Sequence, residues 1–180
     1  MERVVLITGA TGAVGSVVAR TFAATEARLA LTARRIEALQ ELAHQLELAE
    51  ERTLLWAADL AQADQVDALM GAIADRWGGV DILLNIAGGW AGGKRLADLS
   101  EEDWDAMLEM NLRSAFLINR AVLPYMARRG WGRIVNVASR AAVEPGPRQA
   151  AYNVAKAGVV ALTASIAAEY RRQGVAANVI

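Results

Sequence analysis

Short runs of apolar residues alternate along the chain with longer stretches in which apolar residues recur every three or four positions. Short apolar runs are typical of buried strands, and the wider spacing is typical of helices with one buried face. The runs predict strands at residues 4–8, 29–33, 53–58, 81–86, 133–138 and 175–180. The longer stretches predict helices at residues 13–24, 36–46, 66–77, about 100–128 and 150–172.

This alternation of strands and helices runs from one end of the chain to the other, without a linker, repeat or low-complexity segment. Such a pattern favours a parallel sheet with helices on both of its faces. We therefore predict one α/β domain over residues 1–180, a Rossmann-type doubly wound sheet in three layers. Right-handed crossovers place its switch point between the first and fourth strands, where ligands bind at the carboxyl ends of the strands.

Composition narrows the possible functions. The 180 residues carry a net charge of −1, which gives no basic field for nucleic acid or for an acidic membrane. The chain has no cysteine, and His44 is its single histidine, which argues against a disulfide, a histidine triad or a metal site. Nothing resembles a signal peptide, and no apolar run approaches the length of a membrane span. We expect a cytoplasmic protein with no metal, no nucleic-acid partner and no membrane partner.

The turn after the first predicted strand, residues 8–15, is rich in glycine. Glycines permit a tight turn and let the backbone approach a pyrophosphate at the N-terminus of the following helix. A glycine pattern alone is weak evidence, but its place on the first strand–helix turn favours dinucleotide binding. The candidate cofactor-binding residues of this turn are Gly9, Thr11, Gly12, Val14 and Gly15.

The end of the second predicted strand indicates which dinucleotide binds. NAD sites usually place an acidic residue there, which binds the ribose 2′-hydroxyl and would repel a 2′-phosphate. Here Arg34 and Arg35 follow the strand instead, and guanidinium groups bind phosphate through their charge and their forked donors. We predict NADP(H) as the preferred cofactor, with NAD(H) possible. The plainer interpretation is that both arginines are solvated residues at a helix start.

Two polar residues have two interpretations each. Asp59, which precedes Leu60 at the end of the third predicted strand, either accepts a hydrogen bond from an adenine amino group or caps the next helix. Asn111 falls on the apolar stripe of the helix at about 100–128. A buried amide without a hydrogen bond costs about 1–3 kcal/mol, so Asn111 is either a structural polar contact or part of a site.

Tyr152 and Lys156 are four residues apart on a predicted helix, so they share one face. Lys156 and Lys94 are the only lysines among 19 basic residues, and a lysine on a buried face is costly unless it has a role. A phenol is a weak acid near neutral pH, and a nearby ammonium favours its ionised form. Tyr152 can therefore exchange a proton with a carbonyl or alcohol oxygen. Ser139, at the end of the fifth predicted strand, can hydrogen-bond the same oxygen.

Together these motifs resemble the short-chain dehydrogenase/reductase family, in its shorter single-domain branch, and are similar to 3-oxoacyl-carrier-protein reductase-like members. The glycine turn is similar to that branch's TGxxx(A/G)xG pattern. Residues 81–88 resemble its NNAG segment, although Ile86 replaces the second asparagine, which we expect to loosen the local hydrogen bonds. Segments similar to those with the active-site asparagine, serine and YxxxK pair are 110–112, 132–139 and 151–158.

The resemblance implies an oxidoreductase that transfers a hydride between NADP(H) and a small carbonyl or alcohol substrate. It makes Tyr152 the general acid/base, which Lys156 assists while binding the nicotinamide ribose. It implies that Ser139 polarises the substrate carbonyl. It implies that Asn111 fixes the helix geometry and holds a water of the proton relay. The strand end that shapes the cofactor site comprises Asn85, Ala87 and Gly88. It also implies a homodimer through the two long helices that begin near residues 100 and 150.

Two departures from the family pattern leave alternatives open. Gly12 also fits the TGxxGxxG pattern of a longer, sugar-nucleotide-acting branch, which would predict an epimerase that retains NAD. Residues 175–180 resemble the family's sixth strand, after which members continue into a lid and a seventh strand. We therefore expect cofactor binding to survive better than turnover. The alternative to an enzyme is a non-catalytic dinucleotide-binding module or an inactive fragment.

Overall fold

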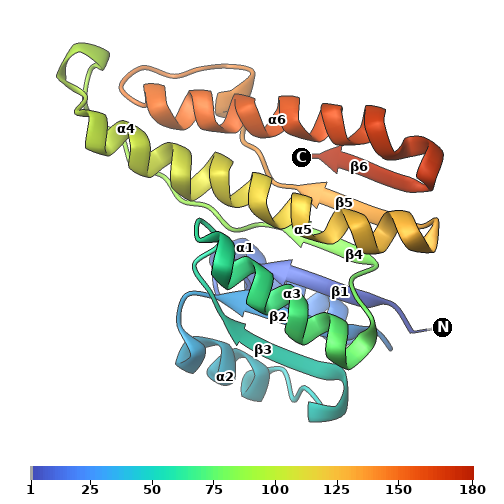
Figure 1. Ribbon diagram of the computed structural model, residues 1–180. Coiled ribbons are helices and arrows are strands. Elements are labelled where there is room, and N and C mark those ends of the chain that lie inside the picture. Colours follow the sequence, from blue (N-terminus) through green and yellow to red (C-terminus); the bar gives the residue numbers. More distant parts are fainter. Residues whose placement is uncertain (1) are drawn as a thin grey trace.

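The computed structural model describes residues 2–180, whose six strands form one parallel sheet (Figure 1). The strands are β1 (Val4–Thr8), β2 (Arg28–Ala33), β3 (Thr53–Ala57), β4 (Ile82–Asn85), β5 (Gly132–Asn136) and β6 (Val175–Val179). Their order in the sheet is β3-β2-β1-β4-β5-β6, and every neighbouring pair is parallel. The order reverses between β1 and β4, which confirms the predicted doubly wound sheet and its switch point.

Helices cover both faces of this sheet. Within residues 2–180 the α-helices are α1 (Ala13–Ala23), α2 (Ile36–Gln45), α3 (Ala63–Trp77), α4 (Glu101–Leu108), α5 (Ser114–Arg129) and α6 (Ala150–Tyr170). Short 3-10 turns lie at Glu50–Arg52, Leu96–Asp98, Arg140–Ala142 and Arg171–Gln173. Helices α1 and α2 pack on one face, while α3, α5 and α6 pack on the other. Apart from the helix expected at about 100–128, the predicted boundaries lie within three residues of these.

The single helix expected at about 100–128 is instead two helices, α4 and α5, joined by a π turn at Glu109–Arg113. They follow one another almost in line in Figure 1. A π turn holds one residue more than a regular turn, which apolar periodicity does not reveal. The start of α4 matches the prediction, because the Ser100 hydroxyl accepts a hydrogen bond from the Asp103 N–H at 3.2 Å.

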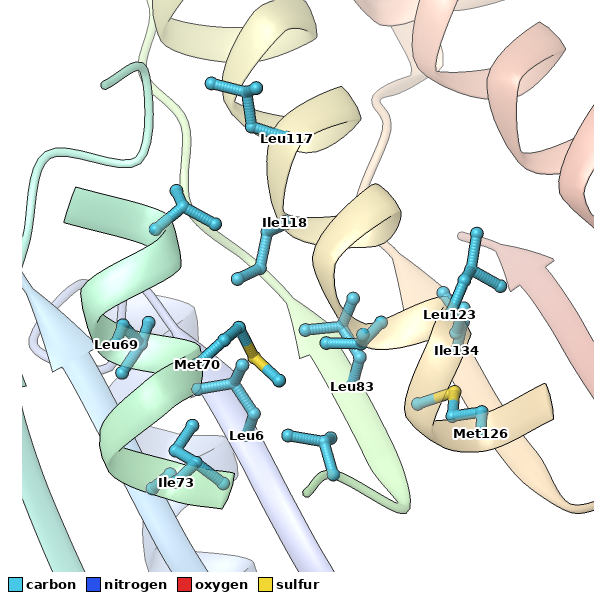
Figure 2. Packing of buried hydrophobic residues seen from close by; sticks show 14 of the residues in the cluster. Leu6, Leu69, Met70, Ile73, Leu83, Leu117, Ile118, Leu123, Met126 and Ile134 are labelled. Atoms are coloured by element: carbon cyan, nitrogen blue, oxygen red, sulfur yellow. The ribbon is translucent and has the colours of Figure 1, made fainter. Parts of the chain in front are cut away.

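The core lies where β1 and β4 meet the helices. Every residue of β1 is buried, as expected for a central strand with helices on both faces. Figure 2 shows one side of this core, where Leu6 and Leu83 of the sheet face Met70 of α3 and Ile118 of α5. Because the central strands are fixed from both sides, their carboxyl ends form a rigid base for the loops that follow.

A buried chain of polar side chains links the carboxyl ends of β1, β4 and β5. The Thr8 hydroxyl donates to Oδ1 of Asn85 at 2.8 Å, and Nδ2 of Asn85 donates to Oδ1 of Asn136 at 2.9 Å. Asn136 exchanges hydrogen bonds with Asn119 of α5 and donates to the Thr163 hydroxyl of α6 at 3.0 Å. We call these five residues the polar ladder. It ties three strands and two helices together just beneath the loops.

The residue that replaces the second family asparagine does not interrupt the polar ladder. The backbone N–H groups of Ile86 and Ala87 both donate to the Thr8 hydroxyl, each at 3.0 Å. Since these bonds use the backbone, they do not depend on the side chain at position 86. The loosening expected from Ile86 is therefore not seen.

One helical segment, Ala150–Gln173, is long and apolar enough to cross a membrane by length and composition alone. The expectation that no apolar run approaches this length was therefore wrong. The segment is long because α6 continues into a 3-10 turn before β6. Its buried face, which includes Lys156 and Thr163, packs against β6 and α5. The core helix of an α/β sheet has the same length and composition, so this segment is weak evidence for a membrane span.

We predict that Asn136→Ala lowers the free energy of unfolding by about 3 kcal/mol, because it leaves the buried groups of Asn85, Asn119 and Thr163 without their partner. Urea denaturation followed by circular dichroism measures the change. The control is Asn178→Ala, which removes an exposed amide from β6 and should cost less than about 0.5 kcal/mol. Equal losses for the two variants would contradict the role assigned to the polar ladder.

Candidate functional site

A cleft of about 580 Å³ opens at the carboxyl ends of β1, β2, β3 and β4, on the switch point. Its size lies within the range of small-molecule and cofactor sites. The predicted cofactor-binding residues that line it are Gly9, Thr11, Gly12, Val14, Gly15, Arg34, Asp59, Leu60, Ala87 and Gly88. The structure thus brings residues from four strand ends to one surface.

The glycine turn lines this cleft with closely packed backbone. Gly9 has a φ of +62°, which favours glycine, and a Cβ there would lie 2.9 Å from Cα of Ala87. A Cβ on Gly15 would overlap the carbonyl oxygen of Gly9. Gly12 is the N-cap of α1 and provides no side-chain cap, so the first N–H groups of α1 face the cleft beside Val14. This backbone surface suits a pyrophosphate.

The two arginines after β2 occupy different places. Arg34 is exposed and lines the cleft, whereas Arg35 does not line it and takes the N-cap position of α2. Within residues 2–180, neither guanidinium makes a hydrogen bond or an ion pair. The wall beside them is Thr32 and Ala33, without a carboxylate. Arg34 therefore brings a positive charge to the end of β2.

Asp59 is not the cap of the following helix, which corrects one of its two interpretations. Helix α3 begins at Ala63 with Gln62 as its N-cap. The Asp59 carboxylate accepts from the Ala61 N–H at 3.0 Å, which closes a turn before the helix. Because Asp59 is exposed and lines the cleft, contact with an adenine remains its other interpretation.

Asn85 lies beneath the cleft rather than in its wall. It is 4% exposed, and its side chain is used by the polar ladder. It therefore positions the loop that follows β4, whose residues Ala87 and Gly88 do line the cleft.

Asn111 and Lys156 converge on Gly88, at the end of β4. A Cβ on Gly88 would lie 2.7 Å from Oδ1 of Asn111 and 3.2 Å from Nζ of Lys156. Oδ1 of Asn111 accepts from the Gly89 N–H at 3.1 Å, and its Nδ2 donates to the Met107 carbonyl at 3.1 Å. Asn111 is thus a structural amide next to a residue that lines the cleft, and its part in the site stays a prediction.

Lys156 is 5% exposed, and its ammonium donates to the Val137 carbonyl at 3.0 Å. Burial lowers the pKa of Lys156 below its ordinary value, because removal from water disfavours the charged form. An ammonium has three N–H donors, so Lys156 keeps donors that can bind a ligand at Gly88.

Tyr152 lies on α6 with Lys156, and Ser139 precedes the turn after β5, which packs against the same helix. Nζ of Lys156 lies 5.9 Å from the centre of the Tyr152 ring, one helical turn away on α6. The Ser139 hydroxyl accepts from the Ala141 N–H at 3.2 Å, at the start of the 3-10 turn that follows β5. That bond fixes the oxygen and leaves the hydroxyl proton free to be donated. Neither residue lines the 580 Å³ cleft. Gly88, which contacts Lys156, does line it.

Part of the cleft wall was not predicted from the sequence. Glu109 and Met110 of the π turn line it, together with Ala106 and Ser114 on either side. The extra residue of a π turn changes which side chains share a face. A regular helical period therefore gave no signal for these four residues.

The sequence model of the short chain dehydrogenase family matches residues 3–180. The chain is 34% identical to D-beta-hydroxybutyrate dehydrogenase of Rhizobium meliloti, over 100% of this chain and 70% of that protein. It is 38% identical to D-threitol dehydrogenase of Mycolicibacterium smegmatis, over 99% of this chain and 68% of the relative.

Solved structures agree with these relatives. A variant of actinorhodin polyketide ketoreductase with NADPH superposes with a TM-score of 0.93 at 34% identity, over 99% of this chain and 69% of that one. A putative 3-oxoacyl-reductase from Bacillus thuringiensis gives a TM-score of 0.92 at 28% identity, over 99% and 75%. On the family match, the identities and the shared fold, this chain belongs to the short-chain dehydrogenase/reductase family of oxidoreductases.

Proposed function

We propose that this protein is an NADP(H)-dependent oxidoreductase that interconverts a carbonyl compound and a secondary alcohol. The observation that carries the proposal is the convergence of Asn111 and Lys156 on Gly88, which also lines the cleft. Tyr152 lies one helical turn before Lys156 on α6. This arrangement supports a proton-transfer group next to a cofactor surface. Relatives named as dehydrogenases and a ketoreductase support the same chemistry.

The shape of the cleft fits a dinucleotide. Gly9 and Gly15 leave no room for a Cβ against the neighbouring backbone, so the turn before α1 is tight, and Arg34 supplies positive charge where an NAD site would place an acid. A 2′-phosphate would be held there by charge-assisted hydrogen bonds. The neighbouring ketoreductase structure with NADPH supports this preference.

The chain's own residues hold and move the proton. The bound nicotinamide supplies or accepts the hydride. In reduction, the Tyr152 hydroxyl gives its proton to the carbonyl oxygen, which becomes the alcohol oxygen, and the tyrosine is left as a phenolate. Ser139 donates a hydrogen bond to that same oxygen and orients it. The ammonium of Lys156 stabilises the phenolate and can donate to ribose hydroxyls. In oxidation the proton moves in the opposite direction.

Tyr152→Phe should lower kcat at least 100-fold, because it removes the proton donor while leaving the cofactor cleft intact. Absorbance at the NADPH band with a small ketone measures turnover, and calorimetry measures NADPH binding, which should change less than about threefold. The control is Tyr170→Phe, at the far end of α6. Full activity in Tyr152→Phe would refute the catalytic role, whereas NADPH binding without turnover by the unmodified protein would indicate a non-catalytic module.

Arg34→Ala should weaken NADPH binding about 10- to 100-fold and leave NADH binding unchanged, because only NADPH carries the phosphate that the guanidinium would contact. Parallel calorimetric titrations of the two cofactors measure the difference. Arg20→Ala, which removes an exposed arginine from the last turn of α1, serves as the matched control. Equal weakening of both cofactors would show that Arg34 does not contact the 2′-phosphate.

Lys156→Met should change how stability depends on pH. The folded-state pKa of Lys156 is lowered below 10.5 by burial, so the folded protein loses this proton before the unfolded chain does. The stability of the unmodified protein then rises with pH between the two pKa values. Any stability advantage of the variant near pH 7 should shrink toward pH 10.5, by about 1.4 kcal/mol per unit of pKa difference. Urea denaturation across this range tests it, and a constant difference between the two proteins would contradict it.

A further inference from the structure

The loop after β4, residues 87–95, is fixed to its surroundings although it has no regular secondary structure. The N–H of Gly89 donates to Asn111, as described above. The N–H of Gly93 donates to the carbonyl of Arg148 at 2.8 Å, just before α6. Lys94 pairs with Asp103 of α4. The Lys94 ammonium, followed by the Ser100 hydroxyl, holds the pKa of the Asp103 carboxyl below its usual value.

Trp90, in the middle of this loop, presents an oriented aromatic ring to solvent. Its side chain is 63% exposed, although an indole of this size is usually well covered. Its Nε1–H donates to Oε1 of Gln149 at 3.0 Å. A Cβ on Gly92 would lie 2.8 Å from the indole ring, so the ring rests against the backbone there. With its polar atom satisfied and one edge held, the ring offers an apolar surface.

The position of this ring relates it to the reaction. Trp90 lies two residues beyond Gly88, where Asn111 and Lys156 converge. Its partner Gln149 is the N-cap of α6, three residues before Tyr152. The indole thus bridges the two segments that carry the site. Val143, four residues after Ser139, is 74% exposed, so the segment after β5 also presents an apolar side chain to solvent.

Charges on these segments are largely paired with each other. Arg140 contacts Glu144 at 2.6 Å, and Lys94 is paired with Asp103. Arg95 and Arg148 are exceptions within residues 2–180, because their exposed guanidinium groups make no ion pair there, and the φ of Arg148 is +60°. Lys94 and Arg140 are thus neutralised by carboxylates, while Trp90 and Val143 offer exposed apolar surface on the same segments.

We propose that Trp90 is a specificity-determining residue, and that its indole selects carbonyl substrates whose carbonyl group bears a planar aromatic substituent. Gln149 is a positioning residue that holds the indole through Nε1. This inference rests on the proposed carbonyl reductase function and names its substrate class. An aromatic pair contributes beyond its buried area by an amount that corresponds to about a two- to tenfold change in selectivity.

The test compares two ketones with the same carbon skeleton, acetophenone and cyclohexyl methyl ketone, which differ in the planarity of the ring. The ratio of kcat/KM for acetophenone to kcat/KM for the cyclohexyl ketone should favour acetophenone several-fold. Trp90→Ala should bring this ratio close to one. Gln149→Leu should lower it, and Gln149→Glu, which keeps an acceptor oxygen, should preserve it. The control is Trp131→Phe, which changes a tryptophan at the amino end of β5, whereas the site lies at the carboxyl ends of the strands. This variant should leave the ratio unchanged.

A second measurement does not require turnover. The indole N–H resonance of Trp90, identified by its absence in Trp90→Phe, should shift when acetophenone is added to the ¹⁵N-labelled protein with NADP⁺. Turnover of both ketones at equal efficiency would overturn the inference while leaving the proposed function intact. A shift without turnover would support the aromatic surface and count against catalysis. The absence of both turnover and a shift would also overturn the inference. So would a preference for 3-oxobutanoate over both ketones that is lost in Arg148→Ala.

Discussion

The polar ladder of Thr8, Asn85, Asn136, Asn119 and Thr163 is the interaction on which the rest of the site depends. Five polar side chains lie in the core, where each unmet hydrogen bond is costly. Their hydrogen bonds all form only when β1, β4 and β5 end at the same level and α5 and α6 lie in register above them. The hydrophobic core admits small slides of one element on another, because apolar contact is not directional. The ladder does not, and so it fixes where the strand ends present their loops.

The site is built upward from this base. Thr8 holds the backbone of Ile86 and Ala87, and Gly88 follows with no side chain to separate Asn111 from Lys156. Lys156 is expensive to bury, yet its helix also carries Thr163, which belongs to the ladder. The same register that satisfies a core hydroxyl therefore brings an ammonium to the end of β4. Stability and chemistry are coupled through one helix.

Much of this arrangement could be predicted from the sequence. The alternation of apolar patterns predicted where the strand order reverses. The glycine turn and Arg34 predicted the position of the cleft. Local patterns could not give the partners of Asn85 and Asn136, which are 51 residues apart, because such a pairing exists only after the sheet forms. They also could not show that Asp59 closes a turn rather than capping α3. Nor could they show that Trp90 and Gln149 meet, 59 residues apart.

The π turn at Glu109–Arg113 sets how far α4 is rotated about the helix axis relative to α5. Each residue added to a helix turns everything beyond it by about 100°. With one residue more than a regular turn requires, α4 is rotated relative to α5 so that Ala106 faces the cleft while Met107 packs inward. Many substitutions in this stretch keep that phase. The loss of a single residue would not, because it would turn the whole of α4 relative to α6, against which it packs.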